Sequence, residues 1–247
     1  MIPIKSEKDL EYLRASGKVL SLVLKDVRRI IKPGITTNEI DRFAEKLILE
    51  NNAQPAFKGY KFFPASACTS INQEIVHGIP SGRILEEGDI VSIDLGVKYH
   101  GYFSDSAVTL AVGKIDTKKR KLIEVTKKSL ELGIKEVGPG KHLSDVSSAI
   151  QKYVENNGFS VVRQFVGHGI GIDLHEEPEI PNFGRPGEGP VLAEGMVLAI
   201  EPMVNMGTWE AEILPNGWTA VTRDKLPSAH FEHTVAVTKK GYEILTI

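Results

Sequence analysis

The chain has 247 residues, of which 41% are hydrophobic and 25% charged, and its formal net charge is -2 at pH 7. This balance indicates a soluble protein with a buried core, and it gives no whole-chain reason to expect binding to DNA or to a membrane. The longest apolar runs are too short to span a bilayer, the N-terminal stretch MIPIKSEKDLEY carries charges where an export signal needs an apolar core, and a single cysteine excludes an internal disulfide. We therefore expect a cytoplasmic protein.

The predicted elements follow an order that begins again halfway along the chain. One helix is predicted over 6–31 and a second over 36–52, because apolar residues recur at helical spacing. Each segment opens with a capping box, a hydroxyl residue followed three positions later by a carboxylate. Two short apolar runs with turn signals, 89–96 and 106–113, predict strands. A basic, helix-like segment over 118–137 comes next, and the pattern then resumes.

This resumption indicates an internal repeat. Pro33-Gly34 ahead of one helix matches Pro139-Gly140 ahead of another, and EGDIVSID, which ends at Asp94, matches EGMVLAIE, which ends at Glu201. Pro33 lies 61 positions before Asp94, and Pro139 lies 62 positions before Glu201, so the two matches keep their spacing. A third match, FSDSAVT with FEHTVAV, follows in each half.

The repeat predicts one domain over residues 1–247, of fold class α+β. We expect two helix-helix-strand-strand halves, at about 6–113 and 122–247, related by a pseudo-two-fold axis, because no linker of low complexity separates them. Their helices would pack on one face of a curved, mostly antiparallel sheet. The second half carries about 20 extra residues, within 209–229, whose Pro-Asn-Gly turn predicts a hairpin or loop over the site.

The matched positions are acidic in both halves. Asp94 aligns with Glu201, and Asp105 aligns with Glu232. We interpret each as a carboxylate at the end of an apolar strand, and four of them near one axis would repel one another unless cations were bound. Carboxylates joined by one imidazole are ligands that suit divalent first-row metals. The imidazole most suited to this role is His168, whose glycine neighbours allow close approach to an ion.

The other histidines are less clear from the residues alone. His77 and His175 lie in VHGIP and LHEEP, and neither belongs to a His-Glu-x-x-His motif. His230 and His233 flank the last of the four carboxylates on a predicted strand, so we expect both side chains to point away from it.

Five motifs carry a family resemblance that covers essentially the whole chain. IDLGVKYHGYFSDSA, VGHGIGIDLHEEPEIPN, MVLAIEPM, AHFEHTV and SINQEIVHGIP closely resemble the type I methionine aminopeptidases. The resemblance implies the pita-bread fold and a monomeric metalloaminopeptidase. It implies dinuclear-metal hydrolysis that removes the N-terminal methionine from nascent proteins when the second residue is small.

The resemblance also implies the site residues. The ligands of two divalent ions, which could be Co, Mn, Fe or Zn, fall on Asp94, Asp105, His168, Glu201 and Glu232. Catalytic roles fall on Glu201, His175 and His77, and the two histidines also contact substrate. The pocket for the methionine side chain falls on Tyr60, Phe63, Cys68 and Trp218, with Phe57 and Leu174 nearby. Several bacterial relatives differ at Phe57 and Phe63, and these aromatic residues alone would indicate only a core cluster.

Two alternatives stay open. An Xaa-Pro aminopeptidase or prolidase of the same fold usually carries an extra N-terminal domain and Arg-x-Glu-Asp around the last ligand, where this chain has FEHT. A non-catalytic ribosome-associated protein of this fold would be expected to lose ligands, and none is lost. The basic run KKRK, 118–121, is interpreted either as a ribosome contact or as a solvated helix face.

Overall fold

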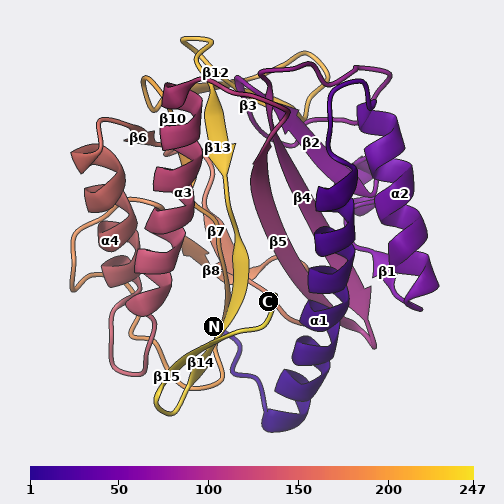
Figure 1. Ribbon diagram of the computed structural model, residues 1–247. Helices are drawn as coiled ribbons and strands as arrows, with labels where there is room; N and C mark the ends of the chain where they lie inside the picture. The colour runs from indigo at the N-terminus through magenta and orange to yellow at the C-terminus, as the bar shows by residue number, and fades with distance from the viewer.

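Two pairs of helices, each followed by strands, succeed one another along the chain (Figure 1). The computed structural model describes residues 1–247. The first half contains α1 (Glu7–Ile30), α2 (Thr37–Glu50), β4 (Ile90–Tyr99) and β5 (Tyr102–Ala111). The second half contains α3 (Thr117–Lys135), α4 (Leu143–Asn156), β9 (Val197–Ile200) and β14 (His233–Thr238). The predicted helix-helix-strand-strand order is therefore present in both halves.

Shorter elements complete the sheets. They are β1 (Gln54–Pro55), the 3-10 helix η1 (Tyr60–Phe62), β2 (Ala67–Ile71), β3 (Glu74–Val76), β6 (Ser160–Val161), β7 (Gly167–Gly169), β8 (Glu176–Ile180), β10 (Met203–Asn205), β11 (Ala211–Ile213), β12 (Ala220–Thr222), β13 (Ser228–His230) and β15 (Gly241–Ile244). The larger sheets have the orders β1-β4-β2, with β5 paired to β4, and β15-β14-β9-β7-β8. Every strand pairing is antiparallel, as the fold class predicts.

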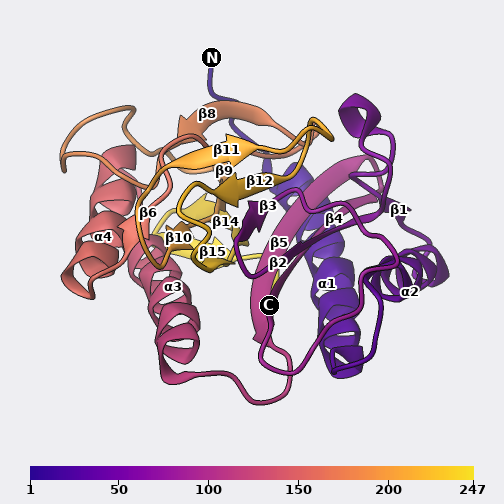
Figure 2. The ribbon, with the colours of Figure 1, turned by 90° about the horizontal axis from the view of Figure 1, so that it is seen from above.

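The four helices lie on one side of the strands, and β11 and β12 lie on the other (Figure 2). One cluster of 38 buried apolar residues draws on all four helices and on strands of both sheets. Leu20, Ile40, Leu122 and Val146 represent α1 to α4 in it. Burial of this shared apolar face holds the two halves together. No helix combines the length and apolar character that crossing a membrane requires.

The local signals in the sequence have the expected structural counterparts. Ser6 and Thr36 each cap a helix, with Asp9 and Glu39 completing the two capping boxes. The insertion in the second half forms the predicted hairpin, β11 paired with β12. Its turn is closed by Asn216, whose Oδ1 accepts from the backbone N–H of Trp218 at 3.0 Å. Trp218 lies in this turn, between β11 and β12.

Candidate active site

Carboxylates from both halves converge on one cavity of about 150 Å³. The five predicted ligands line it: Asp94 on β4, Asp105 on β5, His168 on β7, Glu201 directly after β9 and Glu232 between β13 and β14. Ligand atoms of Asp105, His168 and Glu232 all lie within 4.8 Å of one another. Nε2 of His168 lies 3.6 Å from Oε1 of Glu201. The structure thus brings together residues that are far apart in the sequence.

One expectation about these carboxylates is wrong. Asp94 and Asp105 lie inside ten-residue strands, not at strand ends. The reason is that β4 and β5 pair without interruption down to a hairpin at Tyr99 and Tyr102, well beyond the apolar run that the sequence displays. Only Glu201 and Glu232 lie where their strands stop.

Hydrogen bonds across the two halves fix the positions of the central carboxylates. The backbone N–H of Asp105 donates to Oγ1 of Thr234 at 2.9 Å, and that hydroxyl donates back to the Asp105 carbonyl at 2.8 Å. The Ser106 hydroxyl donates to the Glu232 carbonyl at 2.8 Å, and the Glu232 N–H donates to the Ala107 carbonyl at 2.9 Å. Because β5 belongs to the first half and this segment to the second, the seam between the halves runs through the site.

The protein itself supplies few positive charges or hydrogen-bond donors to these buried carboxylates. Burial raises the pKa of Asp94 to about 6 and that of Glu201 to about 7. Burial, followed by the charge of neighbouring carboxylates, raises the pKa of Asp105 and Glu232 well above the ordinary range. Buried oxygens of Asp94, Asp105 and Glu232 have no hydrogen-bond partner, and the only basic groups that approach Glu201 are imidazoles. Such a set of donors fits divalent cations, which would neutralise the charge and accept the free lone pairs.

His168 presents the correct nitrogen to such an ion. Its Nδ1 lies 2.8 Å from the Gly169 carbonyl, which can only accept, so Nδ1 carries a proton and Nε2 is the nitrogen that faces Glu201. The glycine before it is required by packing against β9, because a Cβ atom at Gly167 would lie 2.3 Å from the Ala199 carbonyl oxygen. The GHG motif therefore brings a strand backbone close to its neighbour and aims one imidazole at Glu201.

His175 reaches the same cavity after a bend. The pairing of β7 with β8 shifts register between His168 and Gly169, and the two imidazole rings lie 4.1 Å apart between centroids. Nδ1 of His175 is 2.9 Å from the hydroxyl of Tyr60, which also lines the cavity. Burial of its ring, followed by the charges of His168 and Lys61, lowers the pKa of His175 to about 3, so it is neutral at physiological pH.

The neighbouring glutamate has a different partner. Glu176 forms an ion pair with Lys5 and accepts from the backbone N–H of Ile172 at 2.8 Å. Its carboxylate is therefore engaged away from the cavity, which it does not line.

The rest of the cavity is an apolar pocket. Its walls are Phe57, Tyr60, Phe63, Cys68, Leu174 and Trp218, the residues expected from the sequence. Phe63 and Trp218 meet edge to face with ring centroids 5.1 Å apart. Burial, followed by the charge of Asp94, raises the pKa of the Cys68 thiol, so this residue is a neutral wall and not a nucleophile.

His77 forms a further part of the wall. It has a left-handed backbone conformation with φ 58°, and its carbonyl accepts from the Thr219 hydroxyl at 3.3 Å. Its ring packs at right angles to Trp218, with centroids 6.1 Å apart. Burial, followed by the charge of His230, lowers the pKa of His77 to about 4, which keeps the ring neutral.

Two residues near the site, Lys61 and His230, were not predicted from the sequence to lie there. Lys61 lines the cavity and extends over the Tyr60 ring; only its position beside the aromatic cluster could have indicated it. His230 was expected to point away from the carboxylates, and that expectation is wrong, because its Nε2 lies 3.6 Å from Oε2 of Glu201. Strand alternation does not support that expectation, because residues 230 and 232 are two positions apart and a period of two places them on the same face.

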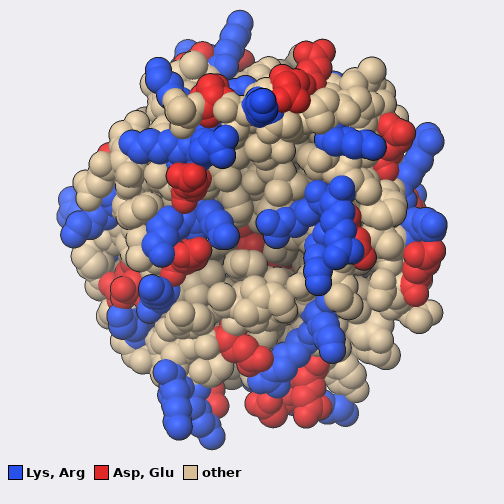
Figure 3. Space-filling view, in the orientation of Figure 1, with Lys and Arg blue, Asp and Glu red and all other residues tan.

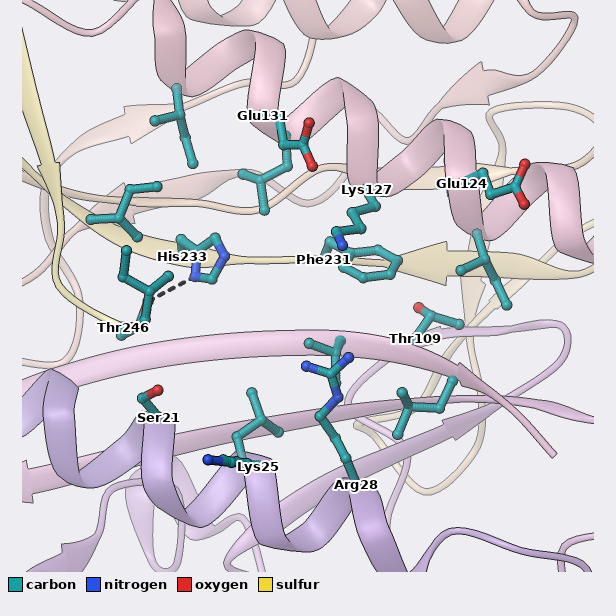
Figure 4. A pocket seen from close by; sticks show the side chains of 18 of the residues that line it. Ser21, Lys25, Arg28, Thr109, Glu124, Lys127, Glu131, Phe231, His233 and Thr246 are labelled. Atoms are coloured by element: carbon teal, nitrogen blue, oxygen red, sulfur yellow. Dashed lines mark hydrogen bonds between the residues drawn. The ribbon is translucent and has the colours of Figure 1, made fainter.

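A larger groove of about 840 Å³ lies between α1 and α3, and it holds none of the predicted site residues. Lys and Arg side chains lie on both of its sides (Figure 3). Arg28 and Lys127 extend toward each other from its opposite walls, and His233 lies on its floor (Figure 4). His233 therefore points away from the carboxylates, as expected, and its Nδ1 contacts the Thr246 hydroxyl at 2.8 Å. This groove lacks the convergent carboxylates of the smaller cavity.

Comparison with known proteins agrees with this geometry. The model of metallopeptidase family M24 matches residues 11–239. Methionine aminopeptidase 1 of Bacillus subtilis is 52% identical over 246 residues, which covers 100% of this chain and 99% of that protein. The crystal structure of methionine aminopeptidase from Rickettsia prowazekii has a TM-score of 0.99 at 44% identity, with 100% of each chain covered.

The prolidase of Pyrococcus horikoshii is a more distant structural relative. It has a TM-score of 0.81 at 25% identity, and the alignment covers 99% of this chain but 63% of the prolidase. The full-length matches at higher identity are with methionine aminopeptidases. The chain belongs to metallopeptidase family M24, and within it to the methionine aminopeptidases.

Proposed function

We propose that this protein removes the N-terminal methionine from nascent polypeptides whose second residue is small. The observation that carries the proposal is a single cavity with an acidic, metal-suited end and an apolar end. At about 150 Å³ it is smaller than the roughly 300–1,000 Å³ of drug-sized ligand sites, so it suits a ligand group about the size of one side chain. Relatives 52% identical over the whole chain are named methionine aminopeptidases.

A divalent metal is part of this chemistry, since the protein is a member of the M24 metallopeptidases. The orphaned carboxylate oxygens and the free Nε2 of His168 support a site for two ions. In this proposal Asp94, Asp105, His168, Glu201 and Glu232 would hold the ions. Co, Mn, Fe and Zn all accept such donors.

The residues around the ions would share the hydrolytic work. When bound, the ions lower the pKa of water and polarise the carbonyl of the first peptide bond. Glu201 would take the proton of the attacking water and pass it to the leaving nitrogen. Neutral His175 donates a hydrogen bond to the carbonyl oxygen as negative charge develops there. His77 holds the scissile amide against the Trp218 side of the cavity.

One assay tests the reaction and its closest rival. The protein loaded with divalent metal is incubated with Met-Ala-Ser and with an Ala-Pro peptide. Release of methionine from the first peptide alone is the expected result. Cleavage before proline alone would show an Xaa-Pro peptidase, and no cleavage with any divalent metal would favour the non-catalytic alternative.

The role of His175 has its own prediction. His175→Ala should lower kcat at least tenfold, because the developing oxyanion loses a donor, while both metal ions stay bound. Activity measurements with Met-Ala-Ser and metal analysis by mass spectrometry check the two halves of this statement. Loss of an ion from the variant would show that His175 is a ligand and would make the assignment wrong.

We further propose a monomer in the cytoplasm that meets its substrates as they leave the ribosome. Direct ribosome contact through 118–121 has limited support, because Lys119 and Lys121 are engaged within the chain. Lys119 donates to the Gly88 carbonyl at 2.7 Å, and Lys121 donates to the Asn157 carbonyl at 3.0 Å. Cosedimentation with ribosomes at low and high salt tests this contact, since an electrostatic one would weaken as salt rises.

A further inference from the structure

His230 is a buried imidazole without a hydrogen-bond partner. It is the last residue of β13, its exposed fraction is 1%, and neither Nδ1 nor Nε2 forms a hydrogen bond. Buried polar atoms in folded proteins are nearly always paired, so an unpaired one marks a functional or strained position. The nearest charged atom to its Nε2 is Oε2 of Glu201, at 3.6 Å.

The ring lies behind the site and not in it. His230 does not line the cavity, although Glu201 and Asp94 both do. Glu201 contacts the imidazole, with 3.6 Å between its Oε2 and Nε2 of His230. His230 therefore lies outside the cavity but against one of the candidate ligands that line it.

The backbone of His230 is held firmly enough to position its ring. Its N–H donates to Oγ1 of Thr109 at 2.8 Å, and the same hydroxyl donates to the His230 carbonyl at 2.8 Å. Ser92 contacts that hydroxyl in turn, at 2.8 Å between oxygens. Strands β4 and β5 of the first half thereby fix a histidine of the second half.

We propose that His230 is a positioning residue of the metal centre, which offers its Nε2–H to Oε2 of Glu201 and leaves Oε1 to face the ion beside His168. The inference rests on the proposed metal centre. The two oxygens of Glu201 already face different imidazoles, His168 at Oε1 and His230 at Oε2, each at 3.6 Å. The separation exceeds an ordinary N–H···O bond by only about half an ångström, so a small side-chain rotation closes it. Fixing one carboxylate oxygen in this way determines how the other binds and accepts protons.

The test uses His230→Ala and His230→Gln, with the wild type measured first. Titration calorimetry with Co²⁺ gives the affinity, the visible spectrum of the Co²⁺ protein reports the ligand geometry, and Met-Ala-Ser hydrolysis gives kcat and KM. We expect His230→Ala to weaken Co²⁺ binding by about tenfold or more, to change the spectrum, and to lower kcat with KM little altered. His230→Gln keeps an N–H donor at similar reach and should recover most of the affinity.

His233→Ala is the matched control, because it removes a partly buried imidazole next to Glu232 whose ring faces the groove. It should leave the Co²⁺ affinity and spectrum as in the wild type, whatever its effect on the melting temperature. The proposal is overturned if His230→Ala binds Co²⁺ with the affinity and spectrum of the wild type. It is also overturned if the glutamine variant recovers nothing, or if His233→Ala loses as much affinity. A wild type that binds no divalent ion would instead refute the proposed function.

Discussion

The catalytic role proposed for Glu201 conflicts with the stability of the folded protein. It is buried beside other acids, and burial raises its pKa to about 7. Glu201→Gln keeps the shape and removes the charge. We expect the metal-free variant to melt a few degrees higher than the wild type at pH 8, because the carboxylates repel one another less. We also expect kcat to fall by at least about 100-fold, because the proton acceptor is lost.

Calorimetric melting without metal and Met-Ala-Ser hydrolysis with metal measure the two effects. Glu212→Gln, at an exposed position of β11, makes the same chemical change away from the site and should alter neither. If Glu201→Gln melted lower than the wild type without metal, the carboxylate would be compensated within the protein, and the argument for bound cations would be wrong.

The sequence predicted which acidic residues converge, but not the local strand structure around them. The repeat matched Asp94 with Glu201 and placed both near one axis, and the structure has both at one cavity. The orientation of His230 toward the site was predictable, because strand alternation places residues 230 and 232 on one face. The break between β13 and β14 was not, because it depends on pairing with distant strands, which local spacing does not report.

Strand β4 shapes the apolar end of the cavity through a glycine. A Cβ atom at Gly96 would lie 2.6 Å from Cε1 of Phe57 and 2.8 Å from Cβ of Ala56. Gly96→Ala should therefore displace Phe57, which lines the pocket, and lower kcat/KM for methionine peptides by about tenfold. Overpacking of this kind costs about 1–3 kcal/mol of stability.

Peptide kinetics and urea denaturation check this prediction. Gly82→Ala is the control, since a Cβ atom at Gly82 would meet nothing within 4 Å and its φ is not positive. Metal affinity should be unchanged in both variants, because Phe57 is an apolar wall of the pocket. Wild-type kinetics in Gly96→Ala would show that Phe57 does not limit the pocket.

Elements with local signals were predicted well, and those that depend on distant pairing were not. Both capping boxes begin helices at the expected residues, and the Pro-Asn-Gly segment forms the expected hairpin. The strands β4 and β5 extend beyond their apolar runs, because pairing with each other continues to Tyr99 and Tyr102. Short strands such as β6 and β7, of two and three residues, carry no periodicity that a sequence could display.

The molecule as a whole is two similar halves with their acids turned toward a common seam. The shared apolar cluster draws the halves together, while the buried carboxylates oppose this association when they are charged. Stability and metal binding must therefore be linked, because bound cations neutralise the carboxylates and remove the repulsion between the two halves. The sequence repeat indicated this arrangement, but the hydrogen bonds that join the halves, such as Thr234 with Asp105, required the structure.

This linkage predicts how stability depends on pH. Unfolded carboxylates ionise near pH 4, whereas folded Glu201 keeps its proton to about pH 7 and Asp105 and Glu232 keep theirs well above their ordinary range. The folded metal-free protein thus binds more protons, and the stability that these give is complete below pH 4 and is lost as the pH rises through 7. Between pH 6.5 and 8 its melting temperature should fall by roughly 3 °C or more per pH unit. Saturating Mn²⁺ should abolish this slope in the same scanning calorimetry, because the ions replace the protons. A melting temperature of the metal-free protein that does not change with pH would show that the seam carries no net charge to neutralise.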